Sequence, residues 1–216
     1  MSEFYTAAQR ALQNQFDTKN LADRLESAIV SEDLPPQHAE FIGQQNMFFL
    51  STVDQFGFPS SSYKGGAVGF VKVVNSKVIE FPNYDGNGMF MSQGNIVDCA
   101  KVGMLFINFE NPHRLRLRGT AELITEESAV AQHPGAQTIT RVQIDRAWMN
   151  CPRYIHKLIP GESSKFVPLP NGTTTFAPWK RLAVFQDVIN DAERAEAEAL
   201  GILSPEEYAA MMAEDS

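Results

Sequence analysis

The chain has 216 residues, of which 44% are hydrophobic and 20% are charged, an ordinary globular composition. Its formal net charge of -8 argues against a broad basic face for nucleic acid. The sequence has two cysteines, no apolar leader at its start, and no apolar run near the roughly 20 residues that a membrane helix needs. These features predict a cytoplasmic protein without nucleic-acid or membrane partners.

The order of hydrophobic patterns predicts three parts. Residues 1–45 are expected to be mostly helical, because Leu21, Leu25 and Ala28 recur at helical spacing. From residue 46 to 186, short apolar runs such as NMFFLSTV and VGMLFINF are separated by turn residues, which is typical of a β-sandwich or barrel. Residues 187–216 are again expected to be helical. The predicted class is mainly β (α+β), a barrel with helices at both ends.

The predicted C-terminal helices carry clear end signals. Gly201 follows NDAERAEAEAL at a typical C-cap position. Ser204 and Glu207 have the spacing of a capping box, with Pro205 at the first helical position. We therefore expect one helix to end at Gly201 and another to begin after Ser204.

A polar, nearly uncharged loop, FPNYDGNGM, separates a predicted strand from a predicted helix. The start of a helix leaves backbone N–H groups unpaired and can bind a phosphate without a basic side chain. Gly86 and Gly88 would allow the backbone to approach an anion, and Asn87 could cap the helix or donate from its amide. Taken alone, the stretch is more typical of a plain loop with a helix cap.

A second polar group, SSSYKGG, lies at the end of a predicted strand, from Ser60 to Gly66. Its hydroxyls, phenol and ammonium are donors that suit a phosphate or the polar edge of a ring. An exposed edge strand carrying a protective Lys is an equally good interpretation.

Arg114, Arg116 and Arg118 alternate with Leu115 and Leu117. The two-residue period of a strand places the three Arg on one face and the two Leu on the other. We interpret two of the Arg as part of a solvated face. The row could also meet an anionic ligand or a second subunit.

The segment MNCPRYIHK places Cys151 two residues before Arg153. A nucleophilic cysteine needs a cation nearby to lower its pKa, and Arg153 or His156 could supply one. We favour a role in lining a ligand site over a role as nucleophile. Cys99 is expected in the core, and the His residues lack a metal-binding spacing, so no metal site is predicted.

The order of these motifs resembles the pyridoxamine 5'-phosphate oxidase-like family of flavin-binding split β-barrels. The matching order is PSSSYK, two hairpin strands, FPNYDGNGM, a helix, GMLFINF and RLRLRGTAEL, over roughly residues 40–155 including NCPRY. The chain looks most similar to the branch described as predicted flavin-nucleotide-binding proteins. The resemblance implies a six-stranded split β-barrel that binds FMN, and a homodimer with the flavin at its interface.

The resemblance also implies cofactor-binding positions. The strand SSSYK would contact the flavin, the strand-to-helix junction would hold its phosphate and ribityl chain, and RLRLRG would lie near the partner's flavin. The implied residues are Ser61, Ser62, Tyr63, Lys64, Pro82, Asn83, Asn87, Gly88 and Arg116, joined by Cys151 and Arg153 of the NCPRY segment. Among these, Lys64 and Cys151 are the expected neighbours of the flavin ring, and no catalytic residue is assigned.

The chain departs from the true oxidase of this family at several positions. Ser62 replaces an Arg, and Gly86, Asn87 and Gly88 replace Ser-Arg-Lys. The late Arg-x-His substrate motif has no counterpart. The expected function is FMN binding by a flavin-dependent oxidoreductase of unknown substrate. The alternatives are a protein that binds or senses flavin nucleotide without turnover, and a barrel that holds a deazaflavin or haem.

Overall fold

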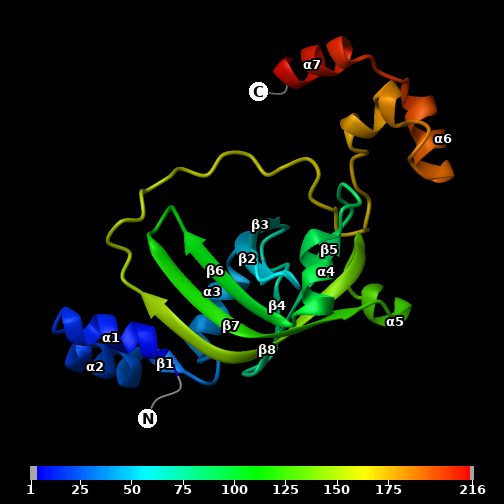
Figure 1. Ribbon diagram of the computed structural model, residues 1–216. Coiled ribbons are helices and arrows are strands. Elements are labelled where there is room, and N and C mark those ends of the chain that lie inside the picture. Colours follow the sequence, from blue (N-terminus) through cyan, green and yellow to red (C-terminus); the bar gives the residue numbers. More distant parts are fainter. Residues whose placement is uncertain (1–3, 215–216) are drawn as a thin grey trace.

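The computed structural model describes residues 4–214 and consists of a β-sheet with helices at both ends (Figure 1). The strands are β1 (Val30–Ser31), β2 (Met47–Val53), β3 (Pro59–Gly65), β4 (Lys72–Asn75), β5 (Val78–Tyr84), β6 (Lys101–Asn108), β7 (His113–Ile124) and β8 (Ala136–Asn150). The α-helices are α1 (Ala7–Gln15), α2 (Lys19–Ile29), α3 (Pro36–Gly43), α4 (Met91–Asp98), α5 (Glu127–Val130), α6 (Asp191–Leu200) and α7 (Pro205–Glu214). Two 3-10 helices, η1 (Pro178–Arg181) and η2 (Ala183–Phe185), precede α6.

The strands form one antiparallel sheet in the order β3-β2-β6-β7-β8-β5-β4, with β1 paired to β8. The sheet is not closed, because β3 and β4 are its two ends. This arrangement confirms the predicted α+β split barrel with terminal helices. The sheet has eight strands where six were predicted, and β1 is too short, at two residues, to give an alternating pattern.

The core lies inside the curved sheet and is centred on Phe48, which is fully buried. The rings of Phe81 and Phe106 have centroids 5.0 Å from that of Phe48, and Phe70 stacks against it at 5.9 Å. Burying such a side chain stabilises the fold by about 1.5–3 kcal/mol. The aromatic cluster therefore joins β2, β5 and β6 around one core.

The N-terminal helices α1 and α2 form a pair beside β1 and β8 (Figure 1). The ring of Phe4 packs edge-on against Trp148 of β8, with centroids 5.3 Å apart. The Thr6 and Gln9 side chains form a capping box that begins α1. The helical prediction for this region holds, apart from the two-residue strand β1.

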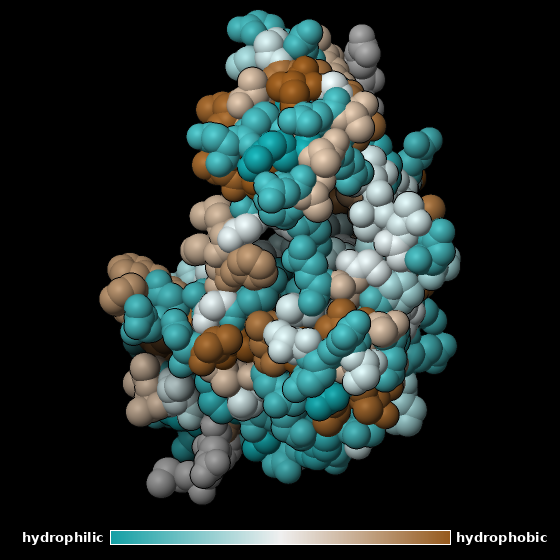
Figure 2. All heavy atoms as spheres, turned by 90° about the vertical axis from the view of Figure 1, so that its right-hand side faces the viewer, coloured by the Kyte–Doolittle hydropathy of each residue, from teal (hydrophilic) through white to brown (hydrophobic). Residues whose placement is uncertain are grey.

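The C-terminal helices α6 and α7 stand apart from the barrel, joined to it through η1 and η2 (Figure 1). Figure 2 shows them as a projection with apolar side chains on its surface. Both predicted end signals are confirmed, since Gly201 ends α6 with a positive φ of 89° and Ser204 and Glu207 form the capping box. Within residues 4–214, no helix is both long and apolar enough to cross a bilayer.

Candidate functional site

The polar loop after β5 leads into α4 through two residues with positive φ. Gly88 has a φ of 74°, a conformation that glycine adopts readily. Phe90 has a φ of 49° at the N-cap position, which is uncommon for an aromatic residue. No side chain caps α4. The first N–H groups of α4 therefore remain available to an anion.

Asn87 stabilises this loop and does not cap the helix. Its Oδ1 accepts a hydrogen bond from the backbone N–H of Met89 at 3.1 Å. This is the local turn that Asn side chains commonly form with the backbone two residues on. The expected helix cap by Asn87 is therefore wrong, and its amide Nδ2 instead donates to the Met89 Sδ at 3.4 Å within the same loop.

The second polar motif meets the start of α4 through one hydroxyl pair. The Oγ atoms of Ser62, on β3, and Ser92, on α4, are 3.1 Å apart. Ser62 pairs with Leu50 and Lys64 pairs with Phe48 in the β2–β3 ladder. Because directly paired residues share a face, Ser62 and Lys64 both lie on the inner face, on the side of the core.

Lys64 is a half-buried ammonium without a counter-ion. Burial lowers the pKa of Lys64, and no carboxylate lies within ion-pair distance of it in the described part of the chain. A desolvated charge without a partner is unfavourable, and an anion beside it would restore the charged form. The inner end of β3 thus combines a cation and hydroxyl groups near the start of a helix.

The other half of the SSSYK motif faces away from this site. Tyr63 is 62% exposed, and its ring packs edge-on against Phe49 with centroids 6.1 Å apart. Ser61 lies beside Ser51, with Oγ atoms 3.4 Å apart. The strand therefore divides the four predicted residues into two pairs, one on each face.

Pro82 and Asn83 are buried within β5. The Asn83 amide donates to the hydroxyls of Thr138 and Thr140, at 3.0 and 2.9 Å. Both of its N–H groups are thereby engaged with β8. Asn83 thus fixes the end of β5 to β8, and Pro82 and Asn83 lie just before the loop that leads to α4.

The Arg strand has the predicted arrangement. Leu115 and Leu117 are 0% and 2% exposed, and the three Arg lie on the opposite face of β7. Arg118 forms an ion pair with Asp145 at 2.7 Å. Arg116 is exposed and pairs in the sheet with Leu105 on one side and Trp148 on the other. Arg116 thus lies on the outer face, away from Ser62 and Lys64.

Cys151 and Arg153 follow the end of β8 and are exposed. The guanidinium of Arg153 lies 5.9 Å from the centroid of the Tyr154 ring. Strands β2, β6 and β7 separate β8 from β3 in the sheet. Within one chain, these two residues are therefore not brought together with the β3–α4 site.

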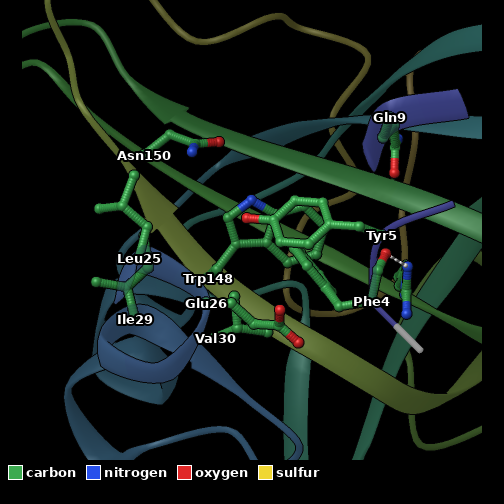
Figure 3. Close-up of a pocket in the computed structure, with 10 residues that line it drawn as sticks. Phe4, Tyr5, Gln9, Leu25, Glu26, Ile29, Val30, Trp148 and Asn150 are labelled. Atoms are coloured by element: carbon green, nitrogen blue, oxygen red, sulfur yellow. Dashed lines mark hydrogen bonds between the residues drawn. The ribbon is translucent and has the colours of Figure 1, made fainter. Parts of the chain in front are cut away.

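A pocket of ≈ 330 Å³ lies between the N-terminal helices and the outer face of β8 (Figure 3). Its centre is aromatic, with Phe4, Tyr5 and Trp148 close together, and Arg118 stacks over the Phe4 ring at 5.0 Å. Sequence reasoning did not single out this pocket, because its walls come from segments more than 100 residues apart. It is a separate hollow from the β3–α4 site.

Sequence reasoning also missed two residues of α4. Ser92 meets Ser62, and the amide of Asn95 donates to the hydroxyl of Thr52 at 3.0 Å. Both α4 residues are buried and three positions apart, so they share one helix face. The available signal in the sequence was the three-residue spacing of Ser92 and Asn95, which places both polar residues on the helix face next to the apolar Ile96.

Comparison with known proteins identifies the family of the chain. The family described as pyridoxamine 5'-phosphate oxidase matches residues 34–150, which is more than half of the chain and includes all eight strands except β1. The chain therefore belongs to the pyridoxamine 5'-phosphate oxidase family. No curated protein matches it.

Several solved structures are similar to the barrel. HupZ of Group A Streptococcus is 21% identical, with a TM-score of 0.43, covering 52% of this chain and 90% of that one. An FMN-binding protein from Syntrophomonas wolfei is 11% identical, with a TM-score of 0.40 and coverages of 66% and 96%. A Clostridium acetobutylicum protein related to general stress protein 26 is 12% identical, with a TM-score of 0.43 and coverages of 53% and 85%.

Proposed function

We propose that the protein binds FMN at the β3–α4 site. The observation that carries this proposal is Lys64, a half-buried ammonium that has no carboxylate partner among residues 4–214 and lies on the same face as the Ser62–Ser92 pair. These groups and the uncapped start of α4 form a set of donors suited to one phosphate. Membership of the family supports the flavin as the molecule that carries this phosphate.

The local backbone is compatible with such a group. A Cβ atom built on Gly86 or Gly88 would meet nothing within 4 Å, so the loop has open space in front of it. The loop, Ser62, Ser92 and Lys64 would hold the phosphate and ribityl chain. Bound FMN would supply hydride or electron transfer, and the chain would supply binding and orientation.

We further propose a homodimer formed through the outer face of the sheet. One row in register crosses five strands, namely Tyr63, Phe49, Leu105, Arg116 and Trp148, and Phe4 of the same chain packs against Trp148 at the end of this row. Aromatic residues and Arg are enriched at protein interfaces. The family resemblance implies that Arg116 of one subunit lies near the flavin of the other, and we propose that Cys151 and Arg153 join it there.

The proposed activity is that of a flavin-dependent oxidoreductase with an unidentified substrate. The side chains that converge at the site are hydroxyls and one ammonium, none of which is a strong general base at neutral pH. This composition also suits a protein that binds or senses flavin nucleotide without turnover. Photoreduced protein that is reoxidised by acceptors no faster than free FMN would support the binding protein over the enzyme.

The phosphate assignment is tested by comparing FMN with riboflavin in a fluorescence titration. We expect FMN to bind at least about ten-fold more tightly than riboflavin, because only FMN carries the anion. Lys64→Met should remove most of this difference. Lys101→Met is the matched control, since Lys101 is exposed and donates to Thr120 on another strand. Equal binding of the two flavins would contradict the proposal.

A further inference from the structure

Lys180, in η1, is a buried lysine that is 4% exposed. Its Nζ donates to Asp85 Oδ2 at 2.5 Å and to Glu193 Oε1 at 2.6 Å. The partners are less buried, with the Asp85 and Glu193 side chains 49% and 26% exposed, so removing either one would leave the buried ammonium short of counter-charge. Asp85 is 95 residues from Lys180 in the sequence, and Glu193 is 13 residues from it.

Asp85 is the first residue of the loop that leads from β5 to α4. Its second oxygen, Oδ1, accepts a hydrogen bond from Gln137 Nε2 at 3.0 Å. Both oxygens of the carboxylate are therefore engaged, one by η1 and one by β8. The start of the loop is therefore held by two hydrogen bonds, one from Lys180 and one from Gln137.

Glu193 lies in the first turn of α6, where Asn190 caps the helix by accepting from the Glu193 N–H at 2.9 Å. Lys180 thus joins three elements: the loop after β5, η1 and α6. It is the charged link between the barrel and the C-terminal helices that Figure 1 shows standing apart from it.

The ion pair between Lys180 and Asp85 affects the charge beside the proposed phosphate site. Asp85 is a carboxylate in the loop proposed to bind phosphate, and Glu193 of α6 is the second carboxylate that Lys180 contacts. Like charges near an anion site oppose binding. Burial pulls the pKa of Lys180 down, but the hydrogen bonds and charges of Asp85 and Glu193 outweigh burial and raise this pKa. Lys180 therefore stays charged and neutralises the carboxylate nearest the loop.

We propose that Lys180 is a positioning residue for the cofactor site, through which the C-terminal segment fixes and neutralises the phosphate-binding loop. This inference rests on the proposed function and adds a residue to it that lies outside the part of the chain matched by the family, residues 34–150. Lys180 does not touch the cofactor in this account. It acts through Asp85.

The test uses the full chain and FMN titration. Lys180→Met is expected to weaken FMN binding by about ten-fold or more, because Asp85 becomes an uncompensated negative charge. Adding Asp85→Asn in the same chain should restore most of the affinity, and Lys180→Arg should retain it. The loss in Lys180→Met should be larger for FMN than for riboflavin, because only FMN carries the phosphate. An equal loss for both flavins would indicate a purely structural role of Lys180.

Hydrogen exchange of the cofactor-free protein gives a second reading. Backbone amides of residues 86–93 should exchange faster in Lys180→Met than in the parent chain. If Lys180→Met does not fold, the same comparison is made with the double variant. Unchanged exchange there, or unchanged FMN affinity in a Lys180→Met protein whose parent binds FMN, would overturn the role of Lys180. Failure of the parent chain to bind FMN would instead overturn the proposed function and this inference with it.

Discussion

At the scale of single residues, Lys64 links the site to pH. Its pKa in the folded protein is lowered by burial below 10.5, the unperturbed value. Between these two pKa values the unfolded chain binds more protons than the folded one. The free energy of unfolding of the cofactor-free protein should therefore rise with pH across this window. Urea unfolding at several pH values should show this rise in the parent chain and a smaller one in Lys64→Met, and identical slopes would contradict it.

Asn87 offers a test of charge at the loop with little change in its shape. An Asp at this position keeps the oxygen that accepts the Met89 N–H, so Asn87→Asp should retain the turn. We expect FMN affinity to fall by about ten-fold or more, because a carboxylate would face the phosphate.

The control for this substitution is Asn75→Asp. Asn75 accepts from the Lys77 N–H at 2.8 Å in an equivalent turn, at the opposite end of β5. FMN affinity should be unchanged in Asn75→Asp. An equal loss in both variants would mean that Asn87 reports only on net charge, and the phosphate would have to lie elsewhere.

At the scale of elements, α4 depends on its anchor to β2. Asn95 and Thr52 are 8% and 1% exposed and hydrogen-bond to each other. Asn95→Ala should lower the free energy of unfolding by about 1–3 kcal/mol, because the Thr52 hydroxyl loses its partner in the core. Thr52→Val in the same chain should recover part of the loss in urea unfolding. Strict additivity of the two changes would contradict a direct coupling.

The alternation of the Arg strand and the terminal helices could be predicted, because each depends on neighbours within a few residues of sequence. The site could be predicted only in outline. The two-residue period of a strand places Ser62 and Lys64 on one face and Ser61 and Tyr63 on the other, whereas the family resemblance implies a cofactor contact for all four. The partners of Asn83 could not be predicted, because Thr138 and Thr140 are 55 and 57 residues away and are brought close only by the pairing of β5 with β8.

Lys180 could not have been found from sequence. It stands in a Pro-rich segment without a clear periodic pattern, and its partners are 95 and 13 residues away. Long-range ion pairs leave no local signal, in contrast to the capping box of α7, whose two partners are three residues apart. The same reason explains why the aromatic pocket beside Trp148 was missed.

At the scale of the whole molecule, the outer row across β3, β2, β6, β7 and β8 predicts self-association. Leu105 lies at its centre, between Phe49 and Arg116. Light scattering should give about twice the chain mass of 24.0 kDa for the parent protein and the chain mass itself for Leu105→Glu. Val74→Glu, on the exposed strand β4, is the control and should remain a dimer. A parent protein that is monomeric would contradict the interface.

The central claim is that this barrel holds FMN, and the most direct measurement is to release and identify whatever the purified protein binds. We expect a yellow protein with absorbance near roughly 450 nm, as for a bound flavin, and FMN as the molecule released and identified by mass spectrometry. If the protein is purified with an empty site, we expect it to take up FMN on titration. A deazaflavin or haem in its place would keep the barrel and change the cofactor. A colourless protein that takes up no FMN would contradict the account.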